Sequence, residues 1–142
     1  MAVRSAVGIT TTHMQELKNI KIPPAVLDLI NQVFEIEKKL DSIKEPNSIQ
    51  RNVRKLRDLI ETDLFTPKGG TASIGFVYNN PIGESYNETR TDCEATVAGT
   101  TTDNLEIVEV IKPIIHYNVS EGGATVKGIA QKAIVIVKSR QK

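Results

Sequence analysis

The first half of the chain carries apolar residues at helical spacing after the pair Pro23-Pro24. Successive members of this set are three or four residues apart, which is the a/d pattern of a coiled-coil seam. Proline suits the start of a helix because its missing N–H is not needed there. The pattern therefore predicts a helix over residues 24–43, and its seam consists of Val26, Leu29, Val33, Ile36, Leu40 and Ile43.

A second helix is predicted after Pro46, because proline disfavours helix in the residue before it. Asn47 is expected to cap this helix, with Gln50 three residues further on in the position of a capping box. Residues 65–70, which contain a proline and two glycines, end it. The apolar positions of this second helix are Ile49, Val53, Leu56 and Ile60.

Two amphipathic helices joined by a short break form a helical hairpin. Each buried Leu or Ile contributes about 1.5–3 kcal/mol, against about 1–2 kcal/mol per residue for ordering the backbone. A hairpin of this size therefore needs a further packing partner. We expect a homodimer in which the seams of two copies meet in a four-helix bundle. The alternative is that the hairpin covers the sheet of its own chain.

From Thr71 onward the pattern changes to short β-rich runs separated by turn residues. The strongest run ends at Pro113, and the last run is apolar on both faces, so we expect it at the centre of a sheet. Residues 81–90 have the composition of an ordered loop, and residues 118–124 that of a flexible connection. The predicted strands cover residues 73–78, 93–97, 105–111 and 133–137.

Strands that follow helices, rather than alternate with them, predict an α+β fold with an antiparallel sheet. We expect three parts: a loose N-terminal arm over residues 1–22, a helical dimerisation hairpin over residues 23–66, and a small β domain with a basic tail over residues 67–142.

Composition narrows the class of partner. The net charge of +1 and the aromatic content of 4% argue against a nucleic-acid-binding surface. The single cysteine excludes an internal disulfide. No apolar run approaches the roughly 18 residues of a spanning helix, and the N-terminus lacks the apolar stretch of a signal peptide. We therefore expect a cytoplasmic protein without membrane contact.

Acidic residues gather around Arg90 in the middle of the chain. Residues 71–123 carry eight Asp or Glu and only two Lys or Arg. One interpretation is a solvated acidic loop with Arg90 as internal counter-ion; the other is a surface that binds a protein with a basic patch. The cluster lacks the spaced Asp/Asn ligands of a calcium loop. Its acidic members are Glu84, Glu88, Asp92 and Glu94.

Catalytic motifs are missing from the sequence. It contains neither a phosphate-binding Gly-x-x-x-x-Gly-Lys loop nor a Rossmann fingerprint, and we expect no cofactor or metal. Cys93 and His116 could form a nucleophile and its base in a small thiol or metal-dependent enzyme. The competing interpretation is that Cys93 is a buried strand residue and that His116 ends a strand.

The order of parts resembles the GrpE family of nucleotide exchange factors. The resemblance begins at Gly75 and continues through Tyr78-Asn79-Asn80-Pro81 and Glu84, although Gly83-Glu84-Ser85 stands where the family has His-Glu-Ala. The run 107–110, followed by Pro113 and Tyr117, is similar to a family strand and the turn after it. Alternate residues of the last run, Ala133, Val135 and Val137, match the family's last strand, while Gln131 and Lys132 replace its Arg-Pro.

This resemblance implies a non-enzymatic function. The β domain is expected to bind the ATPase domain of a DnaK-type chaperone, favour its open cleft and promote release of ADP. The alternative without the resemblance is a structural adaptor, a dimer that presents a β platform to a protein partner. The residues that we expect to contact the partner are Tyr78, Asn80, Glu84, Tyr86 and Arg90.

Overall fold

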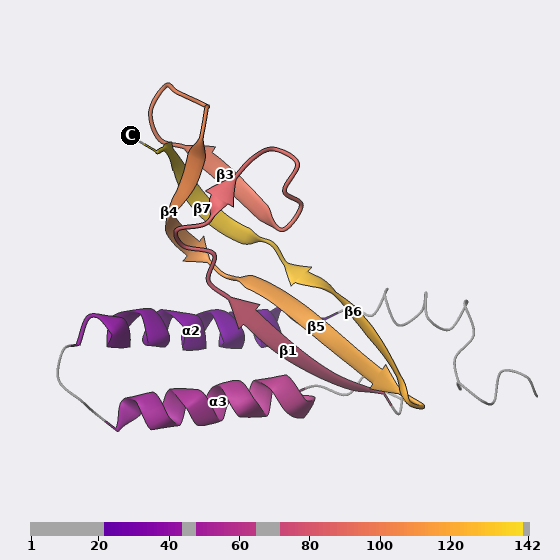
Figure 1. The fold of residues 1–142 in the computed structure, drawn as a ribbon. Coiled ribbons are helices and arrows are strands. Elements are labelled where there is room, and N and C mark those ends of the chain that lie inside the picture. The colour runs from indigo at the N-terminus through magenta and orange to yellow at the C-terminus, as the bar shows by residue number, and fades with distance from the viewer. Residues whose placement is uncertain (1–21, 44–47, 65–71, 141–142) are drawn as a thin grey trace, which may run out of the picture. The chain divides into compact units, whose positions relative to one another are not determined.

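The computed structural model describes residues 22–43, 48–64 and 72–140 (Figure 1). The predicted arm over residues 1–22 lies outside the described residues except for its last position, and so do the cap at Asn47 and the helix end at 65–70. Among the described residues, the order of elements is two helices followed by seven strands, so the predicted α+β class is confirmed. Within this part of the chain, neither helix has the length and apolar character needed to cross a membrane.

The two helices are α2, Pro24–Asp41, and α3, Ile49–Asp63. They form a hairpin, and Arg57 Nη1 of α3 donates a hydrogen bond to Glu37 Oε2 of α2 at 3.0 Å. With 18 and 15 residues the helices are short, so the hairpin is not a long coiled coil. Helix α2 begins at Pro24, as the sequence predicts, because proline occupies its first turn.

The structure divides the predicted seam of α2. Val33 and Leu40 are buried inside the protomer together with Ile30 and Phe34, which were not in the seam. The reason is that the apolar stripe of α2 is wider than the seam. Burial of the second apolar row sets the rotation of the helix about its axis, and with that rotation only alternate seam positions face inward. Val26 is half-buried. The seam residues that remain exposed are Leu29, Ile36 and Ile43.

The strands form two sheets. The three-stranded sheet has the order β1-β5-β6, and the four-stranded sheet has the order β2-β4-β7-β3. The central position of the last strand is thereby confirmed, because β7 lies between β4 and β3. The strands are β1 Ser73–Asn79, β2 Ser85–Tyr86, β3 Cys93–Val97, β4 Leu105–Lys112, β5 Ile114–Glu121, β6 Ala124–Gln131 and β7 Ala133–Ser139.

Two expectations about the strands were wrong. Residues 118–124 are not a flexible connection, because β5 and β6 meet there in a hairpin whose turn is Gly122-Gly123. Both glycines have positive φ, 60° and 84°, as a tight two-residue turn between twisted strands requires. The four-stranded sheet is also not purely antiparallel, because β3 pairs parallel to β7. Residues 98–132 supply the long connection that a parallel pair needs.

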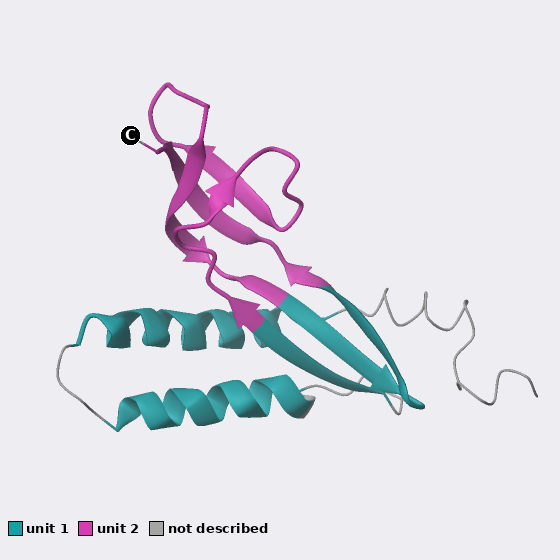
Figure 2. Cartoon of the chain, in the orientation of Figure 1, with its two compact units in different colours: residues 1–77, 116–128 teal, residues 78–115, 129–142 magenta. Residues whose placement is uncertain are grey.

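The chain folds into two compact units (Figure 2). Unit 1 comprises the described residues up to Val77 together with residues 116–128, and unit 2 comprises residues 78–115 and 129–140. Unit 1 joins its hairpin to its sheet by a hydrogen bond from Leu64 N to Ile74 O at 3.1 Å. Next to this bond Gly75 leaves room for α3, since a Cβ at this position would lie 1.8 Å from Glu61 O. Unit 2 contains the residues of the predicted acidic loop.

Candidate protein-binding site

The candidate site is the segment of unit 2 from Asn80 to Asp92, which connects β1 to β3. Its strand β2 pairs antiparallel with β4, with Ser85 opposite Glu106. The backbone contact continues beyond β2, because Gly83 N donates to Ile107 O at 2.8 Å and Ile107 N donates to Glu84 O at 2.9 Å. The predicted loop over residues 81–90 is thus held along the edge of the sheet by main-chain hydrogen bonds.

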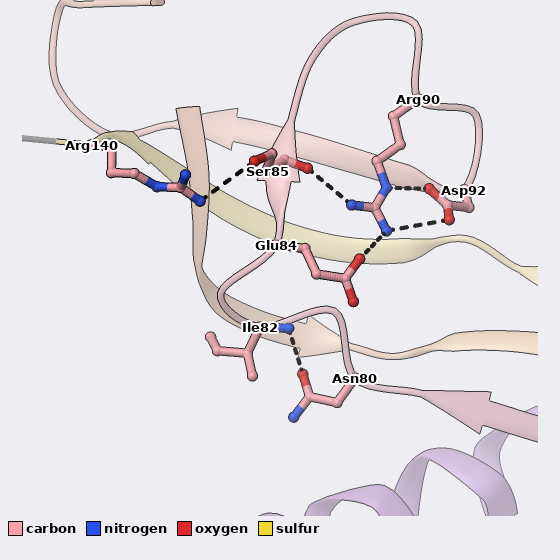
Figure 3. Close-up of polar contacts among 7 residues, drawn as sticks. All are labelled: Asn80, Ile82, Glu84, Ser85, Arg90, Asp92 and Arg140. Carbon is pink, nitrogen blue, oxygen red and sulfur yellow. Dashed lines mark hydrogen bonds and ion pairs between the residues drawn. The ribbon is translucent and has the colours of Figure 1, made fainter. Parts of the chain in front are cut away.

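The entrance to this loop is a turn fixed by Asn80. Its Oδ1 accepts a hydrogen bond from Ile82 N at 3.1 Å, as an Asx turn requires (Figure 3). Glu84 N then donates to Pro81 O at 3.1 Å, and Pro81 itself is buried. Asn80 therefore shapes the backbone with its side-chain oxygen, while the residue remains exposed.

Arg90 binds both ends of the loop together. Its Nε donates to Asp92 Oδ1 at 2.6 Å, and its Nη2 donates to Glu84 Oε1 at 2.7 Å (Figure 3). Nη2 also reaches Asp92 Oδ2 at 3.4 Å, and Nη1 donates to the main-chain oxygen of Ser85 at 3.0 Å. We call this arrangement of Glu84, Ser85, Arg90 and Asp92 the Arg90 clamp. The prediction that Arg90 is an internal counter-ion is confirmed for Glu84 and Asp92.

The electrostatics of the Arg90 clamp follow from these hydrogen bonds. The bond from Arg90 lowers the pKa of Asp92, although burial acts in the opposite direction. The bond to Asp92 likewise raises the pKa of Arg90, against the effect of burial. Both groups are therefore held in their charged forms, which form the shorter and stronger kind of hydrogen bond.

A local turn prepares Arg90 for this position. Asn87 Oδ1 accepts hydrogen bonds from Thr89 N at 3.0 Å and from Thr89 Oγ1. Arg90 N donates to Asn87 O at 3.1 Å, which closes the turn. Asn favours such turns because its side chain competes with the backbone for local donors. The segment 87–90 thus returns the chain toward Glu84.

The structure separates the five residues predicted to contact a partner. Tyr78 is buried at 4% exposure in β1, so its ring belongs to the core and offers no contact surface. It alternates with Ile74 and Phe76, which are buried on the same face of the strand. Arg90 is mostly occupied by the clamp. Asn80 and Glu84 are exposed and Tyr86 is half-buried, so these three form the accessible part of the predicted set.

Arg140 is a member of this region that the sequence analysis missed. The end of the β domain was expected to be a basic tail, yet Arg140 Nε donates to Glu106 Oε1 at 3.0 Å. Arg140 Nη2 also lies 3.5 Å from Ser85 Oγ (Figure 3). Arg140 N also donates to Asn104 O at 2.8 Å. These partners are far apart in the sequence, and the pairings of β2 with β4 and of β4 with β7 bring them together.

The thiol expected in the enzyme alternative lies in an unreactive setting. Cys93 is buried, and burial raises the pKa of its thiol to about 11, so the thiolate is scarce at neutral pH. His116 does not end a strand but lies within β5, in unit 1, whereas Cys93 belongs to unit 2. Among the described residues, no three His, Cys, Asp or Glu side chains gather as a metal site.

Comparison with known proteins adds no relative to this description. No protein-family model, curated protein or solved structure matches the chain. The resemblance to GrpE proteins remains an expectation from the quoted residues and the order of the parts.

Proposed function

We propose that the chain is a non-catalytic co-chaperone that binds the ATPase domain of a DnaK-type chaperone and promotes release of ADP. The Arg90 clamp carries this proposal. It fixes a loop with two exposed carboxylates, Glu84 and Glu88, on the edge of a sheet before any partner arrives. A preorganised surface loses little conformational entropy on binding. The sequence resemblance supports the choice of partner, and such a partner places the protein in the cytoplasm.

The mechanism needs no chemistry from this chain. An exchange factor acts by binding the open form of the ATPase domain more tightly than the closed form. Moving a two-state equilibrium from 1:99 to 99:1 takes about 5.5 kcal/mol of preference. A rigid loop bound in the open cleft cannot adjust when the cleft closes. Closure therefore breaks its contacts, and the loop binds the open form more tightly. The role of the clamp is to keep Glu84 and Tyr86 in one arrangement.

The test measures release of a fluorescent ADP analogue from a purified DnaK-type ATPase domain. Wild type should accelerate release, and the double variant Glu84→Ala, Tyr86→Ala should lose most of this effect while remaining folded. The matched control is Glu121→Ala, Tyr117→Ala, which removes the same two residue types from a strand of unit 1. Equal acceleration by wild type and by the loop variant would show that the contact surface lies elsewhere. No acceleration by wild type with any chaperone of its host would end the exchange-factor proposal.

A second candidate function, a structural adaptor that presents its β strands as a dimer, is favoured by the outer face of the hairpin. Six large aliphatic residues there are 37–54% exposed, and several follow each other seven residues apart. Ile36 and Leu56 immediately precede the ion-paired Glu37 and Arg57. Successive side chains of a helix are about 100° apart. Because the helices run antiparallel, Ile36 and Leu56 therefore turn to the same side of the hairpin relative to that ion pair. We call this set the outer stripe: Leu29, Ile36, Ile43, Ile49, Leu56 and Leu59.

The outer stripe replaces the whole seam as the proposed contact between copies. Ile36→Lys together with Leu56→Lys should convert a dimer to a monomer in sedimentation equilibrium at micromolar concentration. Gln50→Lys, which adds the same charge on the side of Arg57, should leave the mass unchanged. A wild-type monomer at this concentration would remove the dimer from the proposal.

A further inference from the structure

The four-stranded sheet of unit 2 has one face that is buried and one that is open. On β3 and β7 the parallel register places Cys93 beside Ala133 on the buried face and Glu94 beside Ile134 on the other. The antiparallel register of β4 and β7 places Lys112 beside the same Ile134. Because side chains alternate along a strand, Ile136 shares the open face with Ile134.

Two β-bulges enlarge this open face. The register of β4 against β7 shifts between Ile107 and Glu109 and again between Val110 and Lys112, so Val108 and Ile111 are the extra residues. A bulge turns two consecutive side chains toward the same side of a sheet. Val108 and Ile111 are accordingly 46% and 45% exposed, although both are β-branched apolar residues in the middle of a strand. The bulged face has an apolar centre of Val108, Ile111, Ile134 and Ile136.

Polar residues flank this centre on both sides. Beside Ile136 lie Glu109 of β4 and the uncharged Thr96 of β3. Glu94 of β3 and Lys112 of β4 lie at the same level on opposite sides of Ile134. Two strand spacings of about 4.8 Å separate them, with Ile134 in between. Both residues are exposed, and neither forms an ion pair with another residue of the described chain. The carboxylates of the Arg90 clamp, by contrast, are already paired.

We infer that the bulged face binds the bulged face of a second copy of this chain. A two-fold axis parallel to β7 stacks Ile134 and Ile136 on their own counterparts. The same axis exchanges the two sides of the strand, so it sets each Lys112 against the other copy's Glu94. The face is thus complementary to itself at Lys112 and Glu94 as well as in its apolar centre, as an isologous contact requires. Glu109 meets the uncharged Thr96 of the other copy. Two sheets that meet in this way form a sandwich with a shared apolar layer.

The size of the face determines the strength of this contact. Three strands are about 15 Å wide, and six residues of strand are about 20 Å long. The contact area of about 300 Å² is well below the roughly 800 Å² per partner of a stable interface. The contact is therefore weak and reversible. It does not depend on the exchange-factor proposal, and its test uses the purified protein alone.

Chemical crosslinking, here called trapping, tests the contact. In the full chain with Cys93→Ala, the variant Ile136→Cys should form a dimer linked by a short bis-maleimide. The axis sets this position opposite its counterpart, but stacked sheets about 10 Å apart hold the two residues too far from each other for a direct disulfide. Adding Lys112→Glu or Glu94→Lys should slow trapping about tenfold, and adding both should restore the rate. The reference is Glu88→Cys, an exposed loop position outside the bulged face that reports random collisions. Circular dichroism of each variant before crosslinking verifies that it is folded.

The outcomes are decisive in either direction. Trapping at position 136 faster than at position 88, with rescue by the double charge exchange, supports the contact, since rescue requires the two charges to meet between copies. Trapping no faster than at position 88 overturns it, because a half-buried side chain without a contact reacts more slowly than an exposed one. Insensitivity to the single charge reversals, or failure of the double variant to recover, overturns the proposed axis. If these tests fail, the bulged face does not bind a second copy of this chain, and a different protein is then the partner to seek.

Discussion

Replacement of Arg90 by methionine isolates the energetic contribution of the Arg90 clamp. The substitution keeps an unbranched side chain of similar length but removes every donor, so Asp92, Glu84 and the Ser85 carbonyl lose their shared partner. Arg90 is 19% exposed in its side chain, whereas Glu84 is 54% exposed. Water can therefore replace the arginine at Glu84 more readily than at Asp92.

The expected loss of unfolding free energy is about 2 kcal/mol. A pair as exposed as Arg90–Glu84 contributes about 0.2–1 kcal/mol. The hydrogen bonds to Asp92 join two charged groups and are less exposed. Allowing for partial solvation, they contribute about 1–2 kcal/mol to the free energy of unfolding. The bond to the Ser85 carbonyl adds about 0.5 kcal/mol. At a slope of about 2 kcal/mol per molar of urea, the midpoint of unfolding should fall by about 1 M.

Urea unfolding followed by far-ultraviolet circular dichroism measures this shift. The matched control is Arg140→Met, which removes an arginine of the same unit whose side chain is 42% exposed and whose ion pair with Glu106 is correspondingly weak. The control should lower the midpoint by less than half as much as Arg90→Met. Equal shifts for the two variants, or no shift for Arg90→Met, would refute the argument that the clamp holds the loop.

Three further predictions concern single sites. Gly75→Ala should destabilise the protein by about 3 kcal/mol, measured as a large drop in thermal midpoint, because its Cβ would lie 1.8 Å from Glu61 O; wild-type stability would disprove this close packing. Cys93→Ala should cost about 1 kcal/mol, and the native thiol should react with a disulfide reagent only at alkaline pH or on unfolding, since its pKa is about 11; rapid labelling at pH 7 would contradict its burial. The pKa of Asp92 is lower in the folded protein than in the unfolded chain, where it is near 3.9. The pairing of Asp92 therefore stabilises the protein fully at a pH above the unfolded-state pKa, and this stability is lost as the pH falls through the lower pKa of the folded state. Asp92→Asn should abolish that part of the acid dependence in urea titrations at pH 2–6, and an unchanged profile would contradict it.

The sequence predicted those elements whose signal is local. The start of α2 at Pro24 and the strand 93–97 follow from short-range spacing and from the conformational limits of proline. The pair β5 and β6 was missed because polar residues such as Asn118 and Lys127 interrupt their apolar pattern. Their turn, Gly122-Gly123, was the signal that could have revealed them, since two adjacent glycines favour a tight hairpin.

Contacts between distant segments could not be predicted in this way. The acidic cluster around Arg90 indicated an internal counter-ion, but it could not distinguish Glu84 and Asp92, which pair, from Glu88, which remains exposed. The contact of Arg140 with Glu106 depends on the register of β4 against β7, and two bulges shift that register. A bulge leaves no reliable pattern in a strand made of β-branched residues, so the exposure of Val108 was equally hidden.

The central position of β7 determines the order in which unit 2 can fold. The hairpin of β5 and β6 closes a loop of two residues, whereas Cys93 must find Ala133 about 40 residues further along the chain. The entropy cost of closing a loop rises with its length, so the parallel pair should form late. Until residues 133–139 arrive, β3 has no neighbour in its sheet and β4 has only the two residues of β2. During synthesis one edge of the apolar strand 105–112 therefore stays unpaired until β7 has been made. An unpaired strand edge makes the unfinished chain prone to aggregate at this point.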